Sequence, residues 1–155
     1  MTEKTLSGRC AIITGANQGL GREISKSFVT AGADVMLCAR NFDLLEKTVQ
    51  ELKSLIDDNQ KILIKKCDVT NEYQVNALVQ ETFDKLGGCQ ILVNNAGIYG
   101  PKGAIEDQDW NEWKKAIEIN VYGSVLMCRA LIPHFKKRNY GKIIQLSGGG
   151  ATKPL

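Results

Sequence analysis

At 155 residues, with 43% hydrophobic and 24% charged residues, the chain has the size and composition of one ordinary globular domain. Its formal net charge of +3 is too small to indicate a nucleic-acid-binding protein. Its longest basic run, Lys136-Lys137-Arg138, closes a predicted helix, where cations favour the helix dipole. No apolar run approaches the roughly 20 residues that a transmembrane helix requires, so we expect neither a nucleic-acid partner nor a membrane.

The cysteines indicate neither a disulfide framework nor a metal site. They form no C-x-x-C pair and show no metal-ligand spacing with the single histidine, His134. Several lie in or beside apolar segments, where cysteine behaves as a small buried hydrophobe. An odd number of cysteines, with no recognisable signal peptide, predicts the reducing cytoplasm. The five are Cys10, Cys38, Cys67, Cys89 and Cys128.

Apolar strand-like segments alternate with amphipathic helical segments from one end of the chain to the other. The predicted strands are Cys10–Thr14, Asp34–Cys38, Ile62–Lys66, Gln90–Asn94 and Lys142–Leu146. The predicted helices are Gly19–Thr30, Phe42–Ile56, Glu72–Leu86 and Asp109–Lys137. The strands are continuous apolar runs, which is typical of parallel strands covered on both faces. The alternation therefore predicts an α/β fold with a doubly wound parallel sheet and a single domain over residues 1–155.

Asparagines mark the predicted beginnings of two helices. Asn41 and Asn71 each precede an amphipathic segment, and asparagine is among the best N-cap residues. Gln74 lies three residues after Asn71, so we expect these two side chains to form a capping box.

A glycine-rich stretch, Thr14-Gly15-Ala16-Asn17-Gln18-Gly19-Leu20-Gly21, joins the first strand to the first helix. Its glycines allow the backbone to approach a phosphate closely, and the helix N-terminus supplies free N–H donors and a positive dipole end. The strand before it and the helix after it are the context that this motif needs. The stretch therefore predicts a site for a dinucleotide pyrophosphate.

Three further stretches follow the glycine turn in order: Cys67-Asp68-Val69-Thr70, Asn94-Asn95-Ala96-Gly97 and Ile119-Asn120-Val121. With the turn, they resemble the short-chain dehydrogenase/reductase family, whose pattern is Thr-Gly-x-x-x-Gly-x-Gly, Asp-Val, Asn-Asn-Ala-Gly, a helical Asn, a Ser and Tyr-x-x-x-Lys. The resemblance covers essentially the whole chain. It implies a Rossmann-type sheet with five strands in the order 3-2-1-4-5, and hydride transfer between a nicotinamide cofactor and a carbonyl or alcohol carbon.

The resemblance also implies roles for the residues of these turns. Asp68 would accept a hydrogen bond from the adenine amino group, and the alternative is an N-cap for the following helix. Asn95 would contact the adenosine half of the cofactor, while Asn94 would brace neighbouring strands. The residues expected to bind the cofactor are Gly15, Asn17, Gln18, Gly19, Leu20, Gly21, Arg40, Asp68, Val69, Asn95, Ala96 and Gly97.

The end of the second strand predicts which nicotinamide cofactor is bound. An acidic residue there would hydrogen-bond the adenosine ribose diol and select NAD(H). The chain instead has Cys38-Ala39-Arg40-Asn41, with no carboxylate. The guanidinium of Arg40 can bind a 2′-phosphate through two parallel hydrogen bonds, so we predict NADP(H). The alternative is an exposed arginine without a ligand.

Asn120 lies on a helix that is otherwise rich in apolar residues, and a buried asparagine has to be hydrogen-bonded. The resemblance implies that Asn120 holds open a kink and a water that joins the proton relay to the catalytic lysine. Gly123, just beyond it, favours a locally irregular helix. A purely structural asparagine is the alternative.

Two other features carry less functional weight. Trp110 and Trp113, three residues apart, are expected to pack at the start of the last helix or in a subunit interface, which the family builds from its fourth and fifth helices. His134 lies near the end of the same helix with no partner that suggests catalysis. We expect it to be a surface or capping residue.

The catalytic half of the family pattern is only partly present. In the family, a Tyr transfers the proton, a Lys four residues later lowers the pKa of that Tyr, and a Ser after the fifth strand orients the substrate oxygen. Ser147 follows the fifth predicted strand and is the candidate, although many relatives place this serine one position later, where this chain has Gly148. The Tyr-x-x-x-Lys motif does not occur in the 155 residues.

These observations predict the cofactor-binding part of an NADP(H)-dependent oxidoreductase that acts on a small carbonyl or alcohol substrate and forms a homo-oligomer at full length. An exposed sheet edge at Ile143–Leu146 would be an aggregation hazard, which supports an incomplete C-terminus. The alternative is a truncated, catalytically inactive nucleotide-binding or interaction module. A Tyr-x-x-x-Lys motif beyond Leu155 would favour the enzyme.

Overall fold

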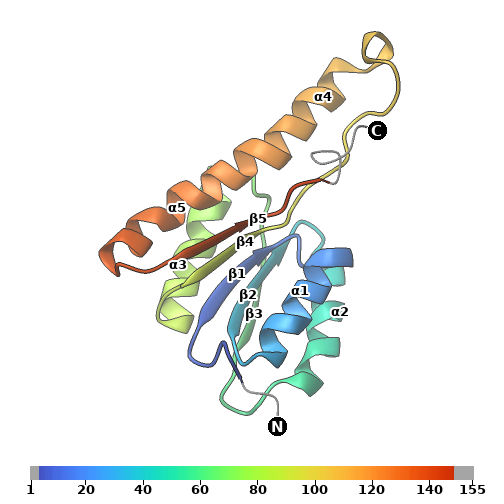
Figure 1. Cartoon of the computed structure of the whole chain (residues 1–155). Helices are drawn as coiled ribbons and strands as arrows, with labels where there is room; N and C mark the ends of the chain where they lie inside the picture. The colour runs from blue at the N-terminus through green and yellow to red at the C-terminus, as the bar shows by residue number, and fades with distance from the viewer. Residues whose placement is uncertain (1–3, 149–155) are drawn as a thin grey trace.

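A computed structural model describes residues 4–148 as a twisted parallel sheet with helices on both faces (Figure 1). The five strands lie in the order β3-β2-β1-β4-β5, and every neighbouring pair is parallel. Their bounds are β1 Cys10–Thr14, β2 Asp34–Ala39, β3 Ile62–Lys66, β4 Ile91–Asn94 and β5 Lys142–Gln145. The doubly wound fold and the strand order are therefore confirmed.

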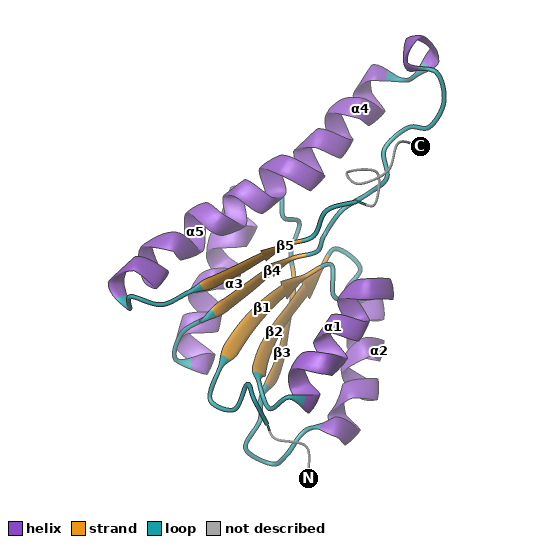
Figure 2. Ribbon diagram, viewed as in Figure 1, coloured by secondary structure: helices purple, strands orange, loops and turns teal. Residues whose placement is uncertain are grey.

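The helices fall into two layers, with α1 and α2 on one face of the sheet and α3 and α5 on the other (Figure 2). The second helix is shorter than predicted, because its last turn tightens into the 3₁₀ turn Lys53–Leu55. The helical bounds are α1 Gly19–Thr30, α2 Phe42–Leu52, α3 Glu72–Leu86, α4 Trp110–Ile117 and α5 Gly123–Lys137, with a further 3₁₀ turn at Ile105–Asp107.

Alternate residues of the central strands build two separate cores. Ile13 and Leu37 face the α1 and α2 layer, whereas Ile12 and Met36 face the α3 and α5 layer. All four side chains are fully buried. Burial on both faces explains why these strands are unbroken apolar runs.

Both predicted asparagine caps are present, but the capping box is not. Asn41 accepts a hydrogen bond from the Leu44 N–H at 3.1 Å, and Asn71 accepts one from the Gln74 N–H at 3.0 Å. The Gln74 side chain does not return to the Asn71 amide. Its Oε1 accepts from the Asp68 N–H at 2.8 Å instead, so Gln74 holds the turn before the helix.

The last helix runs continuously from Trp110 to Lys137, and its α4 end extends past the strands (Figure 1). A π-helical stretch, Glu118–Tyr122, separates α4 from α5 and confirms the predicted irregularity. Within residues 4–148 this helix alone is long and apolar enough to cross a membrane by length and composition. This helix contains no unbroken apolar run in the sequence, because charged residues such as Glu118 and Arg129 interrupt it. The core helix of a globular protein passes the same test when it is mostly buried; here 28% of the apolar stretch is buried, with Met127 and Leu131 fully so.

The edge strand β5 pairs with β4 and, within residues 4–148, with no other strand. Ile143 and Ile144 are 42% and 43% exposed. The apolar segment after α5 is thus an exposed sheet edge, as the sequence analysis expected for this stretch.

His134 is more than the surface or capping residue expected from the sequence. Its ring stacks on Phe83 with the ring centres 4.2 Å apart, and its Nε2 accepts a hydrogen bond from the Cys89 N–H at 3.3 Å. Burial lowers the pKa of His134 below its usual 6.5, and the nearby Arg138 lowers it further. The neutral imidazole is therefore the form that fits this site.

We predict that the stability of the protein falls as the pH drops below about 6.5, because the unfolded chain then binds a proton on His134 more readily than the folded chain does. His134 is the only histidine in the chain, so no other imidazole contributes. Urea unfolding at pH 7.5 and 5.5 measures the effect. The His134→Gln variant, which keeps an acceptor but cannot titrate, should lose less stability over this interval. Equal losses in both proteins would contradict the prediction.

Candidate functional site

The glycine turn after β1 is bonded to the turn after β4. The buried Thr14 hydroxyl oxygen accepts hydrogen bonds from the N–H groups of Asn95 and Ala96, both at 3.0 Å, and donates to Val93 O at 3.3 Å. In return, the Asn95 side-chain amide donates to Thr14 O at 2.9 Å and to Gly15 O at 3.1 Å. Two neighbouring turns thereby become one rigid wall at the carboxyl edge of the sheet.

Glycine is required in this wall for two different reasons. Gly15 adopts φ +64°, a left-handed conformation, and an added Cβ would lie only 2.9 Å from Ala96 Cα. Gly21 has an ordinary φ, but its Cβ would collide with Gly15 O and the Asn95 side-chain amide. The close packing of α1 on the two turns therefore depends on Gly21.

The first turn of α1 faces the same edge with free donors. Gln18, its N-cap residue, makes no side-chain capping hydrogen bond, and the first turn contains no acidic residue. Helix N-terminal N–H groups without a cap attract anions through both hydrogen bonding and the helix dipole. This arrangement suits a pyrophosphate.

These turns, with the ends of β2 and β3, enclose a cleft of about 610 Å³. All the residues expected to bind the cofactor line it. They are Gly15, Asn17, Gln18, Gly19, Leu20, Gly21, Arg40, Asp68, Val69, Asn95, Ala96 and Gly97. The prediction missed other lining residues, among them Ala39, Cys67 and Ile98, whose apolar character carries no motif signal.

The structure shows how Asp68 and Asn95 are held, while their expected contacts with the adenosine half of the cofactor stay predictions. Asp68 is not the N-cap of α3, since Asn71 fills that position. One Asp68 carboxylate oxygen accepts from the Thr70 N–H at 3.0 Å and from the Thr70 hydroxyl at 2.8 Å. The Asn95 amide nitrogen is engaged in the glycine turn, so its first role is to hold the cleft wall.

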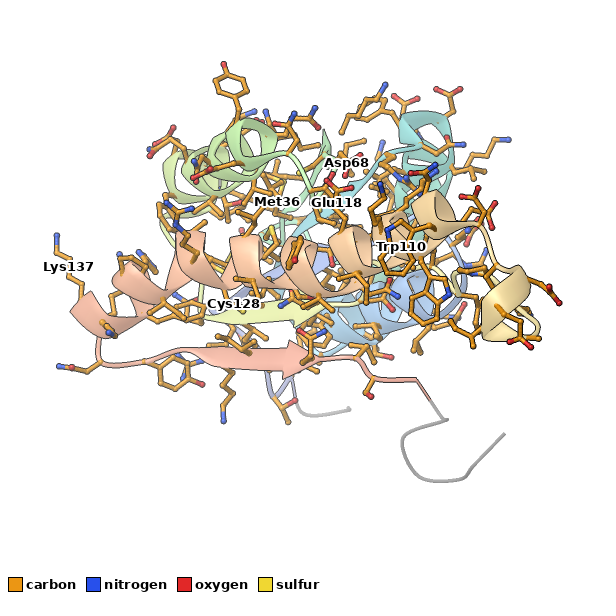
Figure 3. All side chains as sticks on the ribbon, turned by 90° about the horizontal axis from the view of Figure 1, so that it is seen from above. Met36, Asp68, Trp110, Glu118, Cys128 and Lys137 are labelled. Carbon is orange, nitrogen blue, oxygen red and sulfur yellow. The ribbon has the colours of Figure 1, made fainter. Side chains whose placement is uncertain are left out.

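Arg40 is exposed at the mouth of the cleft, and so is free to meet a ligand from solvent. Among residues 4–148 no carboxylate forms an ion pair with its guanidinium. A second basin of about 470 Å³ adjoins it and is also lined by Asp68 and Glu118. Figure 3 shows Asp68 and Glu118 on the same side of the molecule, away from Lys137.

Asn120 lies in the π-helical stretch and is tied to the loop after β4. Its Oδ1 accepts from the Ile98 N–H at 2.8 Å, and its side-chain amide donates to Ile98 O at 2.8 Å. The expectation that Asn120 is buried was wrong: it is exposed, as are Val121 (45%) and Val125 (57%). Gly123 lets α5 approach closely, because an added Cβ there would collide with Val69.

Ser147 and Asn120 line a neighbouring cavity of about 450 Å³, which shares the segment 95–99 with the cofactor cleft. Gln145 also lines this cavity and was missed by the sequence analysis. Its side chain accepts from the Asn94 amide and donates to the Ser124 hydroxyl, both at 3.1 Å. The signal in the sequence that could have identified Gln145 is that it is the single polar residue in the run Ile143–Leu146. Asn94 braces β5, as expected.

The tryptophans lie apart from both cavities. Trp110 is 69% exposed near the far end of the long helix, and with Trp113, Ile117 and Tyr122 it lines an apolar hollow of about 450 Å³ (Figure 3). No group of three or more His, Cys, Asp or Glu side chains within residues 4–148 could hold a metal ion.

Comparison with known sequences points in one direction. A family model described as short chain dehydrogenase matches residues 9–155. The 7alpha-hydroxysteroid dehydrogenase of Escherichia coli (strain K12) is 36% identical over 146 residues, covering 94% of this chain and 55% of that protein. The L-fucose dehydrogenase of Oryctolagus cuniculus is 31% identical over 141 residues, covering 91% and 47%. The chain thus spans about half the length of the curated relatives it matches.

Solved structures share the fold over almost the whole chain. A 7 alpha-hydroxysteroid dehydrogenase complexed with NADH and 7-oxo glycochenodeoxycholic acid has a TM-score of 0.88 and 35% identity, covering 99% of this chain and 58% of that one. A metagenomic short-chain oxidoreductase in complex with NADP has a TM-score of 0.87 and 28% identity, covering 97% and 67%. Since one neighbour holds NADH and the other NADP, the choice of cofactor has to be argued from this chain's own residues.

We predict that Gly21→Ala lowers the free energy of unfolding by about 1–3 kcal/mol, because the new methyl group collides with backbone that cannot move freely. Gly148→Ala is the matched control, since its Cβ would meet nothing within 4 Å among residues 4–148. It should change stability by less than about 0.5 kcal/mol. Urea unfolding of both variants is the measurement, and equal effects would refute the packing argument.

Proposed function

The chain belongs to the short-chain dehydrogenase family, and from that premise we propose that it carries the NADP(H) site of an oxidoreductase acting on a small carbonyl or alcohol substrate. One observation carries the proposal: all the residues expected from the family motifs to bind the cofactor line a single cleft. We take residues 1–155 as one dinucleotide-binding domain, which matches about half of the length of its relatives.

The residues of the cleft fit a dinucleotide. The uncapped N-terminus of α1 offers its N–H groups to the pyrophosphate, and Gly15 and Gly21 leave room for backbone to approach it. Asp68 keeps a carboxylate oxygen for the adenine amino group. When bound, the nicotinamide supplies or accepts the hydride. The Asn95-Ala96-Gly97 turn, shared by the cleft and the adjoining cavity, positions the nicotinamide end beside the substrate.

Arg40 supports NADP(H) over NAD(H). It lies at the mouth of the cleft, no carboxylate within residues 4–148 is paired with it, and no acidic residue stands at the end of β2 to receive a ribose diol. A guanidinium in this position binds a 2′-phosphate through charge-assisted, bidentate hydrogen bonds. The same charge adds little to the affinity for NAD(H), because NAD(H) lacks the 2′-phosphate.

The adjoining cavity is the proposed substrate side. Ser147 lines it, and its hydroxyl would hydrogen-bond a substrate oxygen, as the family role of this serine implies. Asn120 fixes the loop after β4 through its two bonds to Ile98 and so shapes the cavity wall. The named relatives act on substrates as different as a hydroxysteroid and L-fucose, so we propose only the class of small carbonyl or alcohol.

The exposed apolar residues of the long helix support self-association. Trp110, Ile117 and Tyr122 are 69%, 41% and 59% exposed, and together they line one apolar hollow. Contiguous exposed apolar side chains mark interaction surfaces. We therefore assign the homo-oligomer contact to this helix, and the cytoplasm, where free cysteines stay reduced, as the compartment.

We predict that the protein binds NADPH more tightly than NADH and that Arg40→Asp reverses this preference. The lost charge-assisted bonds should raise the Kd for NADPH by at least about tenfold. Fluorescence titration of both cofactors measures the two Kd values. Lys137→Asp makes the same charge change at the far end of α5, and should leave both values nearly unchanged (Figure 3). Equal affinities in the unmodified protein, or tighter NADH, would refute the assignment.

We further predict that these 155 residues bind NADPH without reducing carbonyl compounds. No tyrosine in the sequence has a lysine four residues later, and losing a positioned proton donor costs a rate factor of about 10²–10⁴. NADPH consumption over a panel of ketones and aldehydes is the assay. Turnover by this chain alone would show that another residue supplies the proton.

A further inference from the structure

The cofactor cleft offers few positive charges to its ligand. Among its lining residues within 4–148, Arg40 is the single lysine or arginine, because the glycine turn contributes only uncharged side chains. The pyrophosphate of a dinucleotide has the free N–H groups of α1 as its binding site. A 2′-phosphate carries a further charge of about −1.5 to −2 at pH 7, as phosphate monoesters do. Arg40 alone therefore leaves part of that charge uncompensated.

The second basin, of about 470 Å³, adjoins the cleft at the end proposed for the adenosine. It shares Arg40, Asp68 and Ile119 with the cleft, so the two hollows meet at these residues. Most of its remaining wall comes from α4, which supplies Lys114 and Lys115. Cationic side chains thus surround the opening between the two hollows, although only Arg40 among them belongs to the cleft itself.

The helical spacing of α4 distinguishes the two lysines. Residues three and four apart share a helix face, which places Lys115 on the same face as Asn111 and Glu118. These three residues line the second basin and no other hollow among residues 4–148. Lys114 lines the basin too, but it also lines the apolar hollow beside Trp110. Lys115 is therefore the lysine that serves the basin alone.

The charges of both lysines are available to a ligand. Lys114 and Lys115 are exposed, and within residues 4–148 neither forms an ion pair. The helix dipole accounts for the basic pair Lys136 and Lys137, because α5 ends there. It does not account for the pair in α4, because the helix continues from that pair to Lys137. An anion that enters the basin would give these charges a partner.

Two carboxylates of the basin oppose these charges to different degrees. Asp68 already has one oxygen bonded by Thr70 and is the proposed partner of the adenine amino group. Glu118 is exposed, lies four residues after Lys114 and forms no ion pair within the described chain. Three cationic side chains against two carboxylates leave the basin with a net charge of +1. Its charge therefore favours an anion, and Glu118 weakens that effect.

We propose that Lys115, supported by Lys114, completes a phosphate subsite with Arg40 and helps to select a nucleotide that carries a 2′-phosphate. This inference rests on the proposed NADP(H) function. The guanidinium binds the phosphate through two parallel hydrogen bonds, and the lysine ammonium groups compensate its second negative charge. The ribose diol of NAD(H) is uncharged, so the lysines discriminate between the two cofactors instead of strengthening the binding of both.

The test measures Kd values for NADP⁺ and NAD⁺, which differ only in the 2′-phosphate. The Lys114→Gln, Lys115→Gln double variant should raise the Kd for NADP⁺ at least about fivefold and leave that for NAD⁺ within about twofold. Lys115→Gln alone should account for more of this loss than Lys114→Gln alone. Glutamine and lysine have similar helix propensities, so the helix is preserved. Glu118→Gln should have the opposite effect and lower the Kd for NADP⁺ by about threefold.

The end of α5 offers a matched control. The Lys136→Gln, Lys137→Gln double variant removes the same two charges from another helical turn, far from Glu118 and the basin (Figure 3). It should leave both Kd values unchanged.

Two results would overturn the phosphate subsite. They are an unchanged Kd for NADP⁺ in the Lys114→Gln, Lys115→Gln variant, and equal increases in that variant for NADP⁺ and NAD⁺. If Arg40→Asp still raises the Kd for NADP⁺ in the same experiment, the NADP(H) assignment survives the loss of the subsite. An Arg40→Asp variant that binds NADP⁺ as tightly as the unmodified protein would refute the assignment and the subsite together.

Discussion

The hydrogen bonds between Thr14 and Asn95 are the constraint on which the rest of the site depends. Thr14 is 1% exposed, and its hydroxyl bonds three backbone groups of the β4 segment. The glycine turn has few side chains of its own with which to fix its position. Because Asn95 returns two bonds to it, the position of the turn is set by β4 rather than by local preference. The glycines allow the glycine turn to lie close to the segment after β4, and the hydrogen bonds of Thr14 fix the position of one relative to the other.

The other walls of the cleft are attached to this centre in turn. The Ala16 N–H donates a hydrogen bond to Cys38 O at the end of β2, and this contact helps to position Arg40. Asn120 forms two hydrogen bonds with Ile98, just beyond the turn after β4. The cleft and the cavity beside it therefore share one support.

Much of this arrangement could be predicted from the sequence, because local patterns determine it. The alternation of apolar runs and amphipathic helices predicted the parallel sheet, and Asn41 and Asn71 predicted two helix starts. Long-range partners could not be predicted in the same way. Gln74 has the spacing of a capping box, but its side-chain oxygen accepts a hydrogen bond from the Asp68 N–H instead. Gln145 reads as one polar residue in a strand, and only the packing of α5 on β5 reveals its bond to Ser124.

The prediction that Asn120 is buried was wrong for a different physical reason, which also concerns the proposed oligomer contact. Apolar spacing predicts that a helical face is buried but not which surface buries it. The long helix has one face, with Ile119, Met127 and Leu131, packed into the fold, and a second apolar face, with Ile117, Val121 and Val125, that residues 4–148 leave exposed. Exposing such a face to water is unfavourable in proportion to its area, at about 25 cal/mol per Å². This second face is the physical ground for the oligomer contact proposed on this helix.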